Sequence, residues 1–69
     1  MIIETERQYE ATKEWLERFE RSLRYYEIEA THLSPRMLQL MKDAQRSTIA
    51  DLRAELAEYE ARQRGKATA

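Results

Sequence analysis

Apolar and small residues recur along the first half of the chain at alternating intervals of three and four. They are Tyr9, Thr12, Leu16, Phe19, Leu23, Tyr26 and Ala30. This heptad spacing puts them on one stripe of a helix that faces a partner helix. The outer face carries acid–base pairs such as Glu14 and Arg18, as expected of a solvated surface. With Thr5 and Gln8 in the positions of a capping box, the pattern predicts a helix over about residues 5–31.

A second stripe follows a break at residues 32–34. Proline 35 disfavours helical geometry in Ser34 but suits the first helical position after a serine N-cap. The residues of this stripe are Leu38, Met41, Gln45, Ile49, Leu52, Leu56 and Tyr59. Gly65 has the character of a residue that ends a helix, after a basic run that suits the negative helix end. We therefore predict a second helix over about residues 35–64 and a frayed tail over 65–69.

The two stripes fit each other in one antiparallel register. In an antiparallel hairpin the numbers of facing residues have a constant sum, and six pairs share the sum 68. These pairs are Tyr9/Tyr59, Thr12/Leu56, Leu16/Leu52, Phe19/Ile49, Leu23/Gln45 and Ala30/Leu38. Met41 is expected to fill the space beside Tyr26. The prediction is an all-α fold, a coiled-coil-like antiparallel two-helix hairpin over residues 1–69. The alternatives are one continuous helix and an open arrangement that exchanges helices between chains.

Composition favours a small cytoplasmic protein that associates with itself. Sixty-nine residues form at most one domain with a small core, so a partner chain is expected. The absence of cysteine fits a reducing compartment. Charged residues make up 36% of the chain at a net charge of -1, which disfavours non-specific DNA binding. No apolar run reaches the roughly 20 residues of a membrane span, and the N-terminus is unlike a signal sequence, so we expect a soluble, unprocessed chain.

Several large apolar residues point away from both stripes, mostly near the connection between the helices. They are Trp15, Tyr25, Ile28, Met37 and Leu40. Two helices cannot cover these positions, so we expect them to form the contact surface of a homodimer, most simply a four-helix bundle. The alternative is scattered surface hydrophobic residues, which most proteins carry.

The residues that carry chemistry do not form a recognisable catalytic or metal site. Glu29 and His32 have the spacing of di-iron bundle ligands, but the facing stretch 37–41 contains no carboxylate. The serines have only His32 as a possible base, and Ser34 is better explained as a cap. One glycine cannot build a phosphate-binding loop. We expect no enzyme activity, no catalytic residues, no cofactor and no metal.

Two blocks of the sequence resemble a known bacterial segment. The first block comprises Glu6-Arg7-Gln8-Tyr9, Thr12-Lys13 and Phe19-Glu20, and the second comprises residues 43–47 and 50–60. Together they resemble the helical hairpin that precedes the Xre-type helix-turn-helix domain in HigA-like bacterial antitoxins, here as a stand-alone small protein. The resemblance implies a bacterial, cytoplasmic protein of toxin–antitoxin or related regulatory type. Such antitoxins continue into a DNA-binding domain beyond the position of Ala69, so no DNA-reading residue is carried over.

Three functions are compatible with these observations. The leading hypothesis is a small non-catalytic helical interaction or oligomerisation protein, an antitoxin-like or transcription-regulatory accessory partner. The second is an accessory nucleic-acid binder that uses Arg62, Arg64 and Lys66, because a flexible basic end can contact phosphates without reading sequence. The third is a structural scaffold that only stabilises its own oligomer.

The predicted register is testable by disulfide crosslinking. Cysteines introduced together at Leu16 and Leu52 should crosslink within one chain, because facing residues bring their Cβ atoms within bonding range. Cysteines at Leu16 and Leu38 should stay reduced. Non-reducing gel mobility after mild oxidation, at a concentration low enough to avoid intermolecular bonds, distinguishes the two. Equal crosslinking of both pairs would contradict the register.

Overall fold

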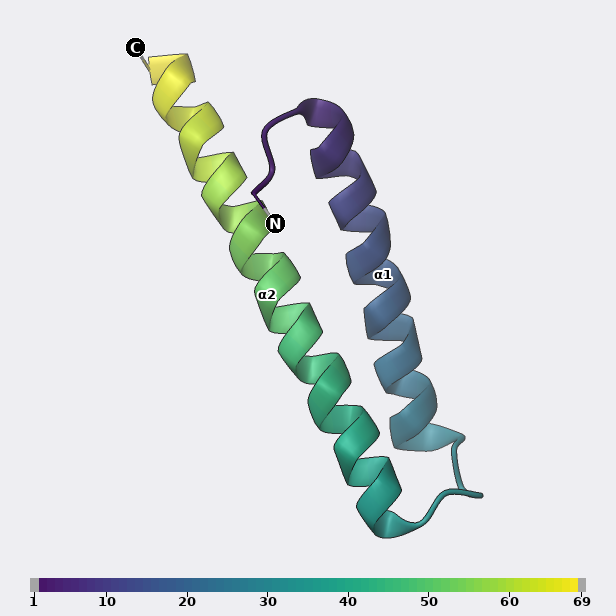
Figure 1. The fold of residues 1–69 in the computed structure, drawn as a ribbon. Helices are drawn as coiled ribbons and strands as arrows, with labels where there is room; N and C mark the ends of the chain where they lie inside the picture. Colours follow the sequence, from purple (N-terminus) through teal and green to yellow (C-terminus); the bar gives the residue numbers. More distant parts are fainter. Residues whose placement is uncertain (1, 69) are drawn as a thin grey trace.

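The chain folds as an antiparallel hairpin of two helices. The computed structural model describes the backbone of residues 2–68 and the side chains of residues 2–66. Helix α1 spans Glu6–Ile28 and helix α2 spans Pro35–Thr68, and they lie side by side in opposite directions (Figure 1). The rod measures 53 × 16 × 16 Å. No helix in the described part of the chain is long and apolar enough to cross a membrane. The predicted hairpin is confirmed, and a single continuous helix is ruled out.

Both predicted helix starts are confirmed. The Gln8 amide donates to Thr5 Oγ1 at 3.1 Å, and Gln8 Oε1 accepts from the Thr5 amide at 3.2 Å. This reciprocal capping box satisfies donors that the first turn of α1 would otherwise leave unpaired. At the start of α2, Ser34 Oγ accepts from the Met37 amide at 3.2 Å. The cap lies directly before Pro35, whose fixed backbone suits the first helical turn.

The predicted end of the first helix at residue 31 is wrong, because α1 ends at Ile28. The Tyr25 carbonyl accepts from the amides of both Glu29 and Ala30, at 2.8 and 3.1 Å, so an ordinary i→i−4 bond and a wider i→i−5 bond share one acceptor where the helix ends. Ala30 then lies in the connection over residues 29–34 and is buried. The longer connection is therefore part of the packed end of the hairpin.

The predicted end of the second helix at residue 64 is also wrong, because α2 continues through Gly65 to Thr68. Gly65 does not adopt the left-handed conformation that ends helices, since no glycine has a positive φ. Glycine inside a helix costs only about 1 kcal/mol relative to alanine, so the strong helix formers around it suffice to carry the helix past it. Residues 65–68 are helical, and residue 69 lies outside the described part.

The predicted register is confirmed at the open end of the hairpin. The rings of Tyr9 and Tyr59 stack with their centroids 4.8 Å apart. Thr12 and Leu56, which form the next predicted layer, are both buried. Thr12 tolerates burial because its hydroxyl donates to the Gln8 carbonyl at 2.7 Å. Along the rest of the seam Ile49 and Ala30 are also buried, whereas Leu23 and several other stripe residues are only partly buried.

The N-terminal residues form an arm that the sequence did not predict. Residues 2–5 turn back from the start of α1 and lie over α2 at the open end (Figure 1). Ile3 is only 1% exposed and packs in one cluster with Leu56 and Tyr59. The Arg62 guanidinium donates to the Ile3 carbonyl, which fixes the arm to α2. The open end therefore has its own small core of three chain segments.

We expect the arm to contribute strongly to stability. Replacing Ile3 with Ala should lower the free energy of unfolding by about 2–5 kcal/mol, since it empties a buried site, and Ile3→Val by about 0.5–1.5 kcal/mol. Ile2→Ala is the matched control, because Ile2 is 64% exposed and should leave stability nearly unchanged. Urea unfolding followed by circular dichroism measures all three. Equal effects at Ile2 and Ile3 would contradict the buried arm.

Candidate interaction surface

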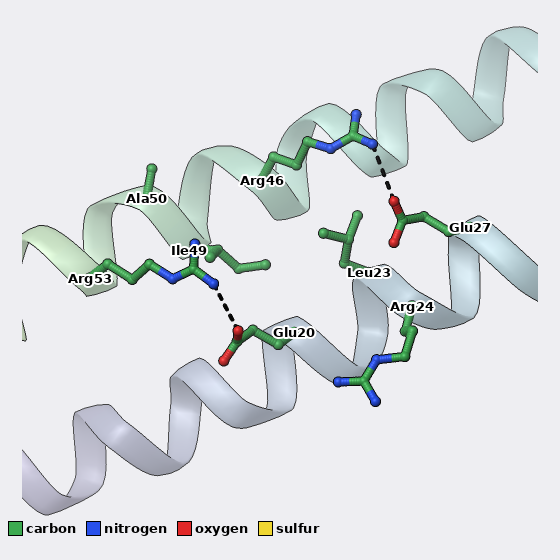
Figure 2. Close-up of a pocket in the computed structure, with 8 residues that line it drawn as sticks. All are labelled: Glu20, Leu23, Arg24, Glu27, Arg46, Ile49, Ala50 and Arg53. Atoms are coloured by element: carbon green, nitrogen blue, oxygen red, sulfur yellow. Dashed lines mark hydrogen bonds and ion pairs between the residues drawn. The ribbon is translucent and has the colours of Figure 1, made fainter.

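One flank of the hairpin is held by ion pairs between the helices. Arg53 pairs with Glu20 at 2.8 Å and Arg46 with Glu27 at 3.4 Å, so the two pairs repeat one heptad apart (Figure 2). All four side chains are more than one-third exposed, so each pair adds only a fraction of a kcal/mol. Ile49 is buried behind them. We call this side the ion-paired flank; its surface is charged, and these four side chains are paired with one another.

The other flank is mainly apolar. One hollow is lined by Trp15, Phe19 and Gln45, among others, and a second hollow nearer the connection is lined by Tyr26, Met37 and Met41. On α1, Tyr26 follows Phe19 by seven residues, and on α2, Met41 precedes Gln45 by four. Residues at these spacings lie on the same face of a helix, so the two hollows lie on one side of the rod. We call this side the apolar flank and define it by Trp15, Phe19, Tyr26, Met37, Met41 and Gln45. The predicted proximity of Met41 to Tyr26 is confirmed.

Aromatic rings form the floor of the apolar flank near its middle. The centroids of Trp15 and Phe19 are 6.2 Å apart, and their planes are tilted by 35°. The guanidinium of Arg18 lies 5.3 Å from the centre of the Trp15 ring, in the range of a cation–π contact. Trp15 nevertheless remains 52% exposed. Its indole is thus held in place by its own helix while half of its surface faces water.

Gln45 introduces an unsatisfied polar group into this flank. Its Oε1 atom is buried and has no hydrogen-bond partner among the described residues. A buried amide oxygen without a partner costs about 1–3 kcal/mol relative to one that is bonded. The sequence placed Gln45 opposite Leu23, a residue that cannot donate to it. The hairpin alone therefore leaves one polar atom of its seam unpaired.

All five residues predicted to contact a partner are exposed. Trp15 and Met37 belong to the apolar flank, at 52% and 47% exposure. Tyr25 borders two hollows, one shared with Met37 and one with Ile28 on the outer face of α1. Leu40 is 58% exposed one turn after Met37. Their contact with a partner remains a prediction.

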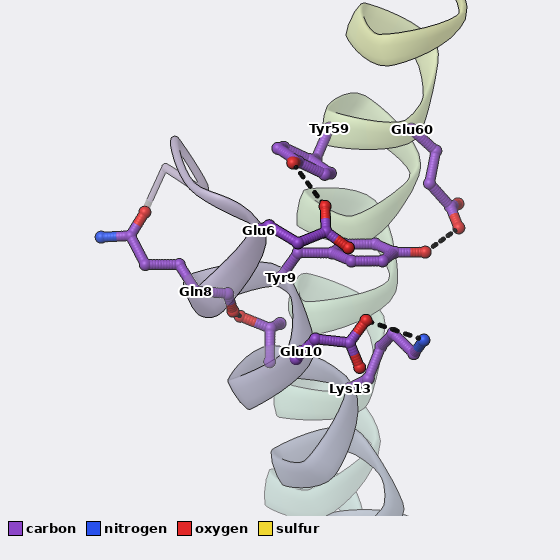
Figure 3. Close-up of polar contacts among 8 residues, drawn as sticks. Glu6, Gln8, Tyr9, Glu10, Lys13, Tyr59 and Glu60 are labelled. Atoms are coloured by element: carbon purple, nitrogen blue, oxygen red, sulfur yellow. Dashed lines mark hydrogen bonds and ion pairs between the residues drawn. The ribbon is translucent and has the colours of Figure 1, made fainter.

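Two tyrosines and two carboxylates form a polar cluster at the open end. The Tyr9 hydroxyl donates to Glu60 at 2.6 Å, and the Tyr59 hydroxyl donates to Glu6 at 3.1 Å (Figure 3). The bond to Glu60 raises the pKa of Tyr9 to about 12, assisted by burial and by nearby carboxylates. Burial, followed by the bond to Glu6, raises the pKa of Tyr59. Each bond joins α1 to α2. Together with the stacked rings of Tyr9 and Tyr59, these bonds hold the two helices in the observed register.

The basic residues near the C-terminus differ from the flexible end that the sequence suggested. Arg62 lies within α2, pairs with Glu58 at 2.7 Å and holds the Ile3 carbonyl. Its guanidinium also lies 5.9 Å from the centre of the Tyr59 ring. Arg64 and Lys66 continue the same helix. Arg62 is therefore a structural residue of the open end.

The Glu29 and His32 pair considered for a metal site belongs to no larger group of ligands among the described residues. Glu29 and His32 lie in the connection, and no group of three or more His, Cys, Asp or Glu residues within the described part could hold a metal ion. No protein-family model, curated protein or solved structure matches the chain. The resemblance to the antitoxin segment therefore stays a prediction.

The tyrosine cluster predicts a loss of stability at alkaline pH. The folded chain holds the Tyr9 proton more tightly than the unfolded chain, in which the pKa is about 10. This contribution is complete below about pH 10 and disappears as the pH rises through about 12. The melting temperature should fall across that window, and less steeply in Tyr9→Phe. Parallel profiles for the two proteins would contradict the role of the Tyr9 proton.

Proposed function

We propose that the protein is a non-catalytic helical interaction module that works as a homodimer. The observation that carries this proposal is the imbalance between exposed and buried apolar residues. Exposure of 41–70% is found for six large side chains: Ile2, Trp15, Tyr25, Ile28, Met37 and Leu40. The buried hydrophobic residues of the described chain are Ile3, Ala30, Ile49, Leu56 and Tyr59. A folded chain with more large apolar residues on its surface than in its core favours burial against another chain.

The accessible area supports the same proposal. The hairpin exposes 5425 Å². A folded monomer of 8.3 kDa is expected to expose about 4,600 Å². The excess of about 800 Å² equals the area that one partner contributes to an interface of standard size. A rod of two helices is the source of this excess, and pairing two rods into a four-helix bundle removes it.

The resemblance to the antitoxin segment suggests what the dimer serves. In that reading the module brings together regulatory partners, and a toxin-like or other regulatory protein is a further partner in the bacterial cytoplasm. The outer faces, which carry Ile28 and Arg21, remain available for such a contact in a bundle. The charged surface of the ion-paired flank suits solvent better than a second copy, because its burial would strip water from four charges.

Sedimentation equilibrium at micromolar concentration tests the proposal. We expect the mass of two chains and a melting temperature that rises with concentration, because dimerisation stabilises only the folded state. Far-ultraviolet circular dichroism of the same samples monitors helix content. A chain that is fully helical and monomeric at these concentrations, with a melting temperature independent of concentration, would contradict the proposal.

A further inference from the structure

We propose that the apolar flank is the surface that receives the second copy, with α1 of each chain against α2 of the other and both connections at the same end. This inference rests on the homodimer proposed above and specifies its geometry. The two copies are related by a two-fold axis that runs parallel to the helices. The ion-paired flanks then face solvent on the two outer sides of a four-helix bundle.

The N-terminal arm buries part of the apolar flank, at the open end of the hairpin. Arg62, which holds the arm, follows Arg53 by nine residues, so it points about 180° away from the ion-paired flank. The arm therefore covers the apolar flank at the open end, where Ile3 is almost completely buried. From Trp15 to Met37 the same flank has no such cover. A second copy would bury the rest of the apolar flank, as the arm buries it at the open end.

Charge complementarity selects the orientation of the second copy. Arg18 lines the hollow of the apolar flank, and Asp51 points about 140–160° away from Arg46 and Arg53, towards the same flank. In the register fixed by Tyr9 and Tyr59, both charges lie near mid-length. With both connections at the same end, Arg18 of one copy meets Asp51 of the other, twice. With the connections at opposite ends, Arg18 would meet Arg18 and Asp51 would meet Asp51, which is unfavourable.

Gln45 supports the same orientation independently. A two-fold axis parallel to the helices places each residue level with its own mate, so the two Gln45 side chains lie at one level on the two diagonally opposite α2 helices. Each amide can both donate and accept, and its terminal torsion is soft enough to turn towards the mate. Reciprocal bonds would satisfy the Oε1 atom that is unpaired in the single hairpin. A buried amide pair of this kind also fixes register, as asparagine does in coiled coils.

A distance measurement between the two connections tests the orientation. The chain contains no cysteine, so Thr31→Cys offers one labelling position in the exposed connection for a spin label. At helix separations of about 8–10 Å, connections at the same end should give a label-to-label distance below about 30 Å. Connections at opposite ends should give a distance that approaches the 53 Å length of the rod. A dimer with the long distance overturns this geometry but leaves the proposed homodimer standing, whereas a monomer overturns both.

A charge-reversal cycle tests the surface itself. Arg18→Glu should weaken the dimer at least about threefold, because it places two acids together at each of two symmetric contacts. Adding Asp51→Arg to the same chain should restore affinity to within about twofold of the native dimer. Arg21→Glu is the matched control, since Arg21 is an exposed arginine of α1 beside Ile28 on the outer face. Sedimentation equilibrium measures each constant, and circular dichroism confirms that the variants are helical.

Two outcomes of the cycle overturn the proposal. If Arg21→Glu weakens the dimer as much as Arg18→Glu, the effect is one of general charge and the apolar flank is not the interface. If Asp51→Arg fails to rescue Arg18→Glu, the two charges do not meet, and the orientation with both connections at the same end is wrong. The proposal is supported if Asp51→Arg restores the affinity of Arg18→Glu and if Arg21→Glu leaves the affinity unchanged.

Discussion

Two helices packed side by side can each hide only one stripe of side chains. A helix surface is a full circle, and one neighbour covers about a third of it, so any apolar residue outside the shared seam stays in water unless another segment reaches it. This constraint explains where the seam between the two helices is buried. At the open end, where a third segment is present, a cluster of buried residues closes the seam, whereas along the rest of the rod most seam residues are only partly buried.

The open end shows how the chain relieves the constraint locally. There the arm adds a third wall, and Ile3, Leu56 and Tyr59 form a core that two helices alone would not enclose. Hydrogen bonds from Tyr9 and Tyr59 to carboxylates on the opposite helix lie beside this core. The packing and the polar bonds at the open end therefore stabilise the same register of the two helices.

The two flanks divide the remaining surface by chemistry. On the ion-paired flank four charged side chains pair within the chain, so burial of this flank against another molecule would cost the desolvation of those charges. The apolar flank combines a half-exposed tryptophan with an unpaired amide oxygen, and both gain by burial against a surface that can also donate a hydrogen bond. A second copy of the same flank supplies both properties. The proposed homodimer would therefore bury both groups.

The sequence by itself determined the elements, their direction and their register at the open end, because these depend on local caps and on the three–four spacing of Tyr9, Leu16 and their mirror partners. It did not place the ends of the helices, since Gly65 is compatible with both a stop and a continuation and only its surroundings decide. Nor did it give the arm: Ile3 precedes any periodic pattern, and its burial depends on Leu56 and Arg62, more than fifty residues away. Likewise, spacing identified Trp15, Tyr25, Ile28, Met37 and Leu40 as uncovered but could not divide them between flanks. That division depends on which side of each helix the ion pairs and the arm occupy, and only the packed hairpin decides it.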